Sequence, residues 1–274
     1  MFLRCGRFSL PLERPLVMGV VNVTPDSFSD GGKFMDREAA VAHARRMVEE
    51  GADLVDVGAE STRPGAHAVS EDEELRRLMP VLESLADLPV PVSVDTRRVR
   101  VMRQALAAGA SMINDVQALQ AAGAPEAVAA SDCAVCLMHM KGDPRTMQKD
   151  PQYGDVVTEV SAFLASRIAA AQASGIARER LTVDPGFGFG KALAHNLELL
   201  RRLGELAVHG VPLLVGLSRK SMLGAITGRP AADRLAPSIA AALLAAHHGA
   251  KILRVHDVRE TRDALAVWQA LRTA

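Results

Sequence analysis

The sequence has no net charge, few cysteines and no long apolar run. Its 32 basic and 32 acidic residues cancel, so no overall field would hold nucleic acid or an anionic membrane, and any anion site must be local. No stretch of about 18 apolar residues is free of a charge or a helix breaker, and the N-terminal residues lack the apolar core of a signal peptide. We therefore expect a soluble, cytosolic protein that binds neither nucleic acid nor a membrane.

The three cysteines, Cys5, Cys133 and Cys136, are too few and too unevenly placed for a disulfide framework. Cys133 and Cys136 form a C-x-x-C pair inside an apolar run that is typical of a strand. Residues three apart on a strand point to opposite faces, so these thiols are poorly placed to pair. We predict that they are buried structural cysteines.

The chain of 274 residues is 49% hydrophobic, which is enough for one large core and suits a single domain over residues 1–274. Short apolar runs alternate along it with segments of helical periodicity. Continuous apolar runs of this kind are typical of parallel strands that are covered on both faces by crossover helices. The expected strands are 16–21, 53–59, 90–96, 111–115, 134–139, 181–185, 212–218 and 251–257.

Eight such units predict an α/β protein with the (β/α)₈ barrel fold, the TIM barrel. A doubly wound open sheet is the alternative, but nothing in the sequence marks an edge strand. Residues 1–15 are expected to form a short strand or turn that closes the bottom of the barrel. Among the expected helices, one covers about 36–50, one begins at a capping box made by Ser70 and Glu73, and one covers about 231–248.

Polar residues stand at the ends of all the expected strands. At any single position, a strand terminator or a helix cap explains the residue equally well. Together they favour a site, because barrel enzymes build their active sites at the C-terminal ends of the strands. The residues are Asn22, Glu60, Thr62, Arg63, Asp95, Asn114, Asp115, Met138, His139, Asp184, Ser218, Arg219, Lys220, Arg254 and His256.

These residues contain two chemical groups. Asp95, Asn114 and Asp184 offer acceptors that suit a flat heterocycle with N–H and NH₂ donors. A set of cations, with Asn22 nearby as a neutral ligand, indicates a phosphate or diphosphate that Mg²⁺ could accompany. The cations are Arg63, Lys220, Arg254 and His256.

Some of these positions have other interpretations. Judged alone, Arg63 and Arg254 are explained equally well by surface salt bridges. Ser218 lies where a helix could begin, so its hydroxyl and the amides there could hold a carboxylate. Residues 22–34 follow the first strand as a long polar loop, which is typical of an active-site lid.

The motif DPGFGFGK at 184–191 resembles nucleotide-binding loops but does not meet their requirements. A Walker motif would need glycine at Pro185 and Ser or Thr at Ala192, and the dinucleotide fingerprint would need glycine at Lys191. The glycines instead permit an unusual backbone that could present Phe187 or Phe189 over a bound ring. A single aromatic residue in such a place is a loop anchor about as often as a stacking partner.

Taken in order, the motifs resemble those of the dihydropteroate synthase family over nearly the whole chain. They are MGVVNVTPDSFSDGG, DVGAESTRPGA, SVDT, IND, CLMHM, DPGFGFGK, GLSRKSM and RVHDV. This family is a (β/α)₈ barrel, usually a homodimer. It joins 7,8-dihydropterin-6-ylmethyl diphosphate to p-aminobenzoate and releases diphosphate, with Mg²⁺ present. The resemblance implies the same fold, small-molecule substrates, cofactor and assembly here.

The resemblance also implies roles for individual residues. The pterin would be held by Asp95, Asn114, Met138, Asp184, Phe189, Gly216 and Lys220. The diphosphate would be held by Asn22, Arg63, Arg254 and His256, and Asn22 would also meet Mg²⁺. The p-aminobenzoate site would comprise Thr62, Pro64, Phe189, Ser218 and Lys220. The catalytic residues would be Asp95, Lys220, Arg254 and His256.

We expect a dissociative substitution in which the loops at 22–34 and 60–69 close to exclude water. One rival is a pterin-binding methyltransferase barrel that passes a methyl group from a reduced folate to a corrinoid protein. It would have no use for the cation pair of RVHD. A second rival is a catalytically silent paralogue, which should have lost a key residue such as Asn22, Arg63, Lys220 or His256, and all are present.

Overall fold

The computed structural model describes residues 1–23, 33–60, 69–143 and 146–273. Its parallel strands are β3 (Leu16–Asn22), β4 (Leu54–Gly58), β5 (Val92–Asp95), β6 (Met112–Asp115), β7 (Ala134–Met138), β8 (Leu181–Asp184), β9 (Leu214–Val215) and β10 (Ile252–Val255). They stand in the order β8-β7-β6-β5-β4-β3-β10-β9. A bridge between Val183 and Leu213 joins the two ends of this order, so the sheet curls into a nearly closed barrel. The predicted (β/α)₈ fold is confirmed.

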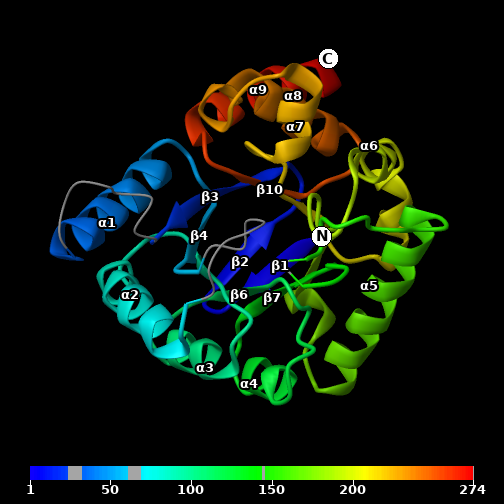
Figure 1. Ribbon diagram of the computed structural model, residues 1–274. Helices are drawn as coiled ribbons and strands as arrows, with labels where there is room; N and C mark the ends of the chain where they lie inside the picture. The colour runs from blue at the N-terminus through cyan, green and yellow to red at the C-terminus, as the bar shows by residue number, and fades with distance from the viewer. Residues whose placement is uncertain (24–32, 61–68, 144–145, 274) are drawn as a thin grey trace.

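Helices connect the strands and surround the barrel (Figure 1). They are α1 (Lys33–Glu49), α2 (Glu71–Ser84), α3 (Val99–Ala107), α4 (Ala124–Ala129), α5 (Val156–Ala173), α6 (Leu193–Arg201), α7 (Ser221–Thr227), α8 (Leu235–His247) and α9 (Val258–Thr273), with the 3₁₀ segments η2 (Arg178–Arg180), η3 (Leu203–His209) and η4 (Ala231–Asp233). Ser70 caps α2 as predicted, because its side chain accepts from the N–H of Glu73 at 3.2 Å. The single helix expected at 231–248 is divided by Arg234 into η4 and α8. None of the described helices is long and apolar enough to cross a membrane.

An antiparallel hairpin closes one end of the barrel. It consists of β1 (Phe2–Cys5) and β2 (Phe8–Pro11), and it lies across the centre of the view in Figure 1. Its buried side chains pack against the first residues of several strands, which form the barrel floor. The floor cluster comprises Leu3, Cys5, Leu12, Leu16, Met18, Leu54, Met112, Ala134, Cys136, Leu214 and Ile252. The expectation that residues 1–15 close the bottom is therefore confirmed.

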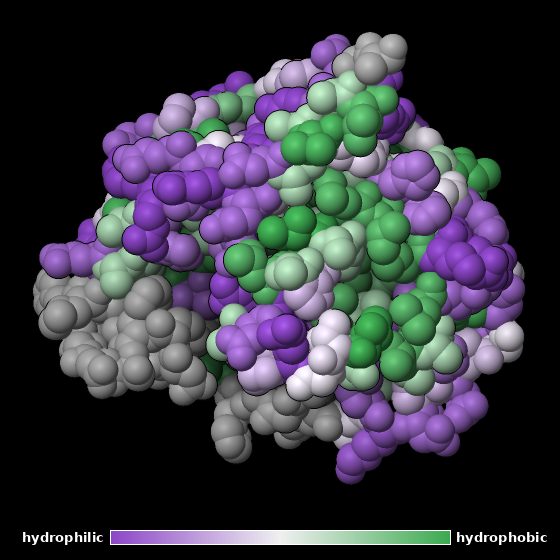
Figure 2. Space-filling view, turned by 90° about the horizontal axis from the view of Figure 1, so that it is seen from above, coloured by the Kyte–Doolittle hydropathy of each residue, from purple (hydrophilic) through white to green (hydrophobic). Residues whose placement is uncertain are grey.

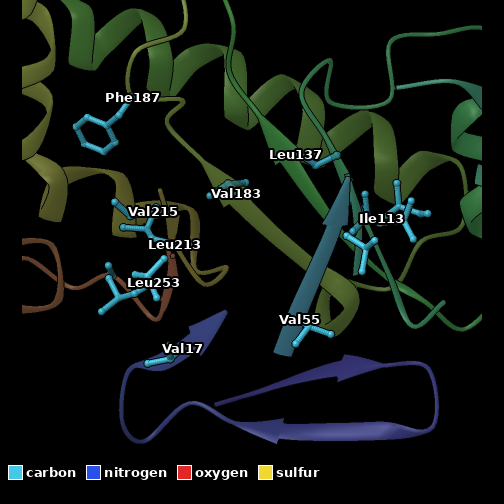
Figure 3. Close-up of a cluster of buried hydrophobic side chains, with 14 of the residues drawn as sticks. Val17, Val55, Ile113, Leu137, Val183, Phe187, Leu213, Val215 and Leu253 are labelled. Atoms are coloured by element: carbon cyan, nitrogen blue, oxygen red, sulfur yellow. The ribbon is translucent and has the colours of Figure 1, made fainter. Parts of the chain in front are cut away.

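Alternate residues of each strand face the barrel interior and the helices. Leu54 and Met112 belong to the floor cluster, whereas their neighbours Val55 and Ile113 belong to the larger outer core. Figure 3 shows the outward side chains of Val55 and Ile113 together with others of that core. The same alternation places residues two positions beyond the floor inside the barrel. The C-terminal end is thereby left for polar side chains.

The two cysteines of the C-x-x-C pair confirm this alternation. Cys133 lies in the outer core and Cys136 in the floor cluster. Both are buried free thiols, because the strand directs them to opposite faces as predicted.

One strand is shorter than predicted. The run PLLVGLS predicts a strand over 212–218, but β9 contains only Leu214 and Val215. Pro212 has no N–H to donate, and its carbonyl instead accepts from Val183 N at 3.0 Å. Past β9 the chain turns, since Lys220 N bonds to the carbonyl of Leu217 at 3.2 Å. This turn brings residues 218–220 over the open end of the barrel.

Candidate active site

Arg254 lies between two carboxylates at the C-terminal end of the barrel. Its Nε is 2.6 Å from Oδ2 of Asp56, and its Nη2 is 3.1 Å from Oδ2 of Asp95. The side-chain amide of Asn114 donates to the same Asp56 oxygen at 3.1 Å. Asp56 is fully buried, and its Oδ1 has no hydrogen-bond partner among the residues that the structure describes. Buried charges of this kind are tolerated only when they are paired, so each member depends on the others.

Burial displaces the pKa values of the groups around Arg254. It raises the pKa of Asp95 to about 7, while Arg254 opposes the shift and Asp56 adds to it. Burial also raises the pKa of Asp184, and Lys220 opposes that rise. It lowers the pKa of Lys220 to about 8, with Asp184 opposing. Several displaced titrating groups at one end of a barrel are typical of a functional site.

The 184–191 loop adopts a backbone that only glycine allows at two positions. Gly186 has φ +69°, and a Cβ there would lie 1.9 Å from the carbonyl oxygen of His139. Gly190 has φ +64°, and a Cβ there would lie 2.1 Å from the carbonyl oxygen of Lys141. The loop therefore lies directly on the residues that follow β7. The N–H of Gly186 also donates to Oδ1 of Asp184 at 2.7 Å, which orients that carboxylate.

The two phenylalanines of this loop have different surroundings. Phe187 is fully buried and belongs to the outer core (Figure 3), so it is a loop anchor. Phe189 is half-buried, and the ammonium of Lys220 lies 4.8 Å from the centre of its ring. The same ammonium donates to the carbonyl of Phe187. Of the two candidates for contact with a bound ring, the structure supports Phe189.

Ser218 and His256 form a second polar pair at this end. The hydroxyl oxygen of Ser218 is 3.0 Å from Nδ1 of His256 and accepts from its backbone N–H at 3.3 Å. The expectation that a helix begins near Ser218 is wrong, because α7 begins at Ser221. The intervening Arg219 has φ +59°, and Asp257 accepts from its guanidinium at 2.5 Å. The turn that carries Lys220 is thereby tied to the residue after His256.

Comparison with known proteins places this arrangement in a family. The family described as pterin binding enzyme matches residues 18–256. The dihydropteroate synthase of Neisseria meningitidis serogroup C is 53% identical over 98% of this chain and 96% of its own. A structure of Xanthomonas albilineans dihydropteroate synthase with 4-aminobenzoic acid has a TM-score of 0.94 and 56% identity, covering 100% of this chain and 98% of that one. Another from the same organism, in complex with 7,8-dihydropteroate, has a TM-score of 0.89 and 50% identity, covering 100% and 99%.

The chain belongs to the dihydropteroate synthases. A member of this family is an enzyme, a transferase of folate biosynthesis. The methyltransferase alternative has no support among these relatives, all of which are named as dihydropteroate synthases.

Most of the residues expected to bind substrate in a dihydropteroate synthase meet at the C-terminal end of this barrel. Arg254 contacts Asp95 there, and Lys220 contacts the 184–191 loop. Gly216 lies beside Arg254, because a Cβ built on it would be 3.7 Å from the Cβ of Arg254. The others lie in the last two residues of a strand or directly after one, namely Asn22, Asn114, Met138, Asp184 and His256. Thr62, Arg63 and Pro64 lie outside the described residues, as does most of the 22–34 loop and of the 60–69 loop.

Two of the strand-end residues have structural roles. The carboxylate of Asp115 accepts from the N–H groups of Gln117 and Leu119 at 2.8 and 2.7 Å, so it caps a turn. The ring of His139 is buried and contacts Lys191 behind the 184–191 loop. For Asp115 this agrees with the alternative interpretation as a cap, whereas His139 is a buried partner of Lys191.

Sequence reasoning missed Asp56, which the structure places beside Arg254 and Asn114. The available signal was a charge in the middle of the apolar strand LVDVG, where nothing on the surface could account for it. A second missed cluster joins Glu74, Thr96 and Arg98. Thr96 donates to buried Glu74 at 2.6 Å, and Arg98 lies 3.0 Å from the same carboxylate. Arg98 also contacts Glu60 at 3.1 Å, so this cluster supports the chain where β4 leads towards the site.

Proposed function

We propose that this site condenses 7,8-dihydropterin-6-ylmethyl diphosphate with p-aminobenzoate by dissociative substitution, giving 7,8-dihydropteroate and diphosphate. The observation that carries the proposal is the juxtaposition of acceptors and cations at one end of the barrel. Arg254 is within hydrogen-bond distance of both Asp56 and Asp95. A substrate with a donor-rich ring and an anionic leaving group needs both kinds of group side by side.

The pterin ring binds to the acceptors. Asp95, Asn114 and Asp184 come from neighbouring regions of the barrel wall, and their oxygens accept from the ring N–H and NH₂ groups. Asp184 is held in one orientation by the N–H of Gly186, so the ring finds a preformed acceptor. Met138, which is buried at the end of β7, and Gly216 line the ring. The absence of a side chain at Gly216 leaves room beside Arg254.

The diphosphate binds to the cations, Arg254 and His256, with Arg63 expected to join them. Asn22, half-buried at the end of β3, is the expected contact for Mg²⁺. Among the described residues, no group of three or more His, Cys, Asp or Glu side chains could hold a metal. Mg²⁺ usually keeps several waters and binds through one or two protein oxygens and the substrate phosphates, so a single amide oxygen fits it. When bound, the ion would neutralise part of the diphosphate charge.

p-Aminobenzoate binds beside the Phe189 ring, with Ser218 and Lys220 near its carboxylate and with Thr62 and Pro64 as further expected contacts. Lys220 can serve both substrates because its ammonium lies between the loop carbonyl of Phe187 and the Phe189 ring. Sulfonamides, which mimic p-aminobenzoate, are expected to compete at this position.

In the reaction, the carbon–oxygen bond to the diphosphate breaks first, and both bonding electrons leave with the diphosphate. Arg254 and His256 stabilise the charge that develops on it. The dihydropterin methylene cation that remains is delocalised into the ring and is stabilised by the carboxylate of Asp95. The aryl amine then attacks the methylene carbon and loses a proton to solvent. An aryl amine is already nucleophilic, so no strong general base is required.

The second candidate function is a catalytically silent pterin-binding paralogue, and one assay separates the two. Diphosphate release is measured from the dihydropterin diphosphate in Mg²⁺, with and without p-aminobenzoate. The proposal expects release that depends on p-aminobenzoate and equals the dihydropteroate formed. Tight pterin binding without release would favour the silent paralogue, and no pterin binding would contradict both.

We also propose that the protein works as a homodimer, in the cytosol. The location rests on composition alone. The assembly is supported by exposed apolar side chains on consecutive helices, namely Leu197 of α6, Ile226 of α7, and Leu235 and Leu244 of α8. Figure 2 shows hydrophobic side chains gathered on the face above these helices. Exposed apolar patches of this kind commonly mark contacts between proteins.

A further inference from the structure

Lys191, the last residue of the DPGFGFGK motif, has a buried ammonium group. Its side chain is 2% exposed. Nζ lies 2.9 Å from the carbonyl oxygen of Gly186, 3.1 Å from that of Phe189 and 2.9 Å from Nδ1 of His139. An ammonium has three donors, and these acceptors use all of them. Burial lowers the pKa of Lys191 well below its ordinary value, and Asp184 opposes this shift. The ammonium form therefore depends on these partners, since a buried charge without partners would be strongly unfavourable.

The partner histidine is set up as an acceptor. Burial, and after it the charge of Lys191, lowers the pKa of His139 to about 3. The ring is therefore neutral at physiological pH, with its proton on Nε2 and a lone pair on Nδ1 towards Lys191. His139 follows β7, so Lys191 ties the 184–191 loop to the neighbouring strand of the barrel.

The two carbonyls that Lys191 binds are those of Gly186, next to Phe187, and of Phe189 itself. The same loop is also held by Asn196, which accepts from Gly188 N at 2.8 Å, and by Tyr153, whose hydroxyl donates to the Gly190 carbonyl at 2.9 Å. On the site side, Lys220 binds the Phe187 carbonyl and lies over the Phe189 ring. Lys191 and Lys220 therefore bind the backbone of the same loop, Lys191 at Gly186 and Phe189 and Lys220 at Phe187.

Lys191 also contributes charge near the pterin acceptor Asp184. Burial raises the pKa of Asp184, and the rise is opposed by Lys220, by the N–H of Gly186 and by Lys191. Loss of the Lys191 charge would raise the pKa of Asp184 further. The carboxylate would then be ionised over a narrower range of pH.

We propose that Lys191 is a positioning residue for the substrate site. It fixes the loop backbone that presents Phe189 and receives Lys220. This inference rests on the proposed function, because Phe189, Lys220 and Asp184 are placed at the substrates by that proposal. It gives the final lysine of the motif a role that does not involve contact with a nucleotide or with either substrate.

The test compares Lys191→Met with Lys141→Met. Lys141 lies nearby but is 44% exposed, and its ammonium pairs with Glu159 at 3.2 Å and lies 4.1 Å from the centre of the Tyr153 ring. The control therefore makes the same substitution without removing any of the contacts to the carbonyls of Gly186 and Phe189 or to His139. For Lys191→Met we expect KM for both substrates to rise about tenfold or more, because small displacements of positioning groups have effects of this size. We also expect kcat to change much less than KM, because Lys191 contacts the loop backbone and His139 and no reacting atom. Lys141→Met should retain wild-type values.

A pair of His139 variants keeps the test decisive if Lys191→Met does not fold, as judged by thermal melting. His139→Asn retains an acceptor near Nδ1, whereas His139→Leu removes it. We expect His139→Asn to stay close to wild type and His139→Leu to raise KM. The inference is wrong if folded Lys191→Met has wild-type KM values, or if His139→Leu behaves like His139→Asn.

Failure of the proposed function would be seen separately, in the wild type. If the wild type releases no diphosphate, that proposal fails. The role of Lys191 is then measured by calorimetric titration with 6-hydroxymethylpterin, whose affinity should fall about tenfold in Lys191→Met and stay unchanged in Lys141→Met. Equal affinities in the two variants would contradict the inference.

Discussion

At the scale of single residues, the central feature of the site is that two carboxylates, Asp56 and Asp95, share the guanidinium of Arg254. The guanidinium pairs with Asp56 and with Asp95, and removing it would leave the buried Asp56 and the largely buried Asp95 without this counter-charge. Because Asp56 raises the pKa of Asp95 and Arg254 opposes the rise, the charge on Asp95 depends on where Arg254 points. Arg254 can move towards the diphosphate only at the expense of these pairs.

Asp95 gives the sharpest prediction at this scale. Its pKa in the folded protein is raised to about 7 by burial, so the carboxylate is ionised above that value and protonated below it. Since we propose that the ionised form stabilises the methylene cation, kcat/KM should fall as pH decreases through about 7. Asp95→Asn should lose most of kcat, about 100-fold or more, and should also lose the acid limb. Steady-state rates measured over about pH 5.5–9, on both sides of this pKa, test the loss of kcat and the loss of the acid limb. An unchanged kcat in the variant would exclude this role.

Site residues at strand ends could be predicted from the sequence better than residues in the middle of a strand or in a loop. Asp95, Asn114 and Arg254 could be found because a parallel barrel directs its strand ends to one place. Asp56 could not be linked to Arg254, because the two are far apart in sequence and only the barrel topology brings β10 beside β3, one strand away from β4. The same holds for Lys191 and His139, whose pairing depends on the path of a loop and not on any periodicity.

At the scale of elements, the strands and helices could be predicted from the hydrophobic pattern, whereas the turns could not. The short β9 and the start of α7 at Ser221 result from a proline and from a left-handed residue, Arg219. Periodicity carries no information on such local backbone choices. The 184–191 loop is the clearest case, because its glycines are needed for close approach to two carbonyls and not for binding a phosphate.

Substitution of Gly186 tests that explanation. Gly186→Ala places a Cβ 1.9 Å from the carbonyl oxygen of His139, whereas Gly188→Ala, also at positive φ, has its nearest neighbour at 3.5 Å, the flexible Cδ of Lys220. Gly188→Ala should cost about 1 kcal/mol of unfolding free energy from backbone strain alone. Gly186→Ala should cost at least about 2 kcal/mol more, because backbone must move. Urea denaturation of both variants measures the difference, and equal losses would show that the close contact relaxes freely.

At the scale of the whole molecule, the two ends of the barrel have separate tasks. The β1–β2 hairpin and the floor cluster fill the N-terminal end with apolar side chains, which leaves the polar groups at the C-terminal end. The apolar surface over α6, α7 and α8 lies on the side wall, on elements that follow β8 and β9. Helix α7 begins directly after Lys220, so a contact on this wall would also support the turn that carries Lys220, the lysine that we propose to bind substrate.

This geometry makes the assembly testable through both mass and activity. Leu244 is half-exposed on α8, and Leu244→Glu would place a charge in the proposed contact, where it has no partner and would be desolvated. We expect it to convert the dimer to monomer in sedimentation experiments. We also expect KM to rise modestly, because the turn at Lys220 loses support from the neighbouring helices. Val208→Glu is the matched control, since Val208 is exposed on η3, which packs on α5. If wild type sediments as a monomer, or if both variants stay dimeric, the apolar wall has another purpose and the active site is complete within one chain.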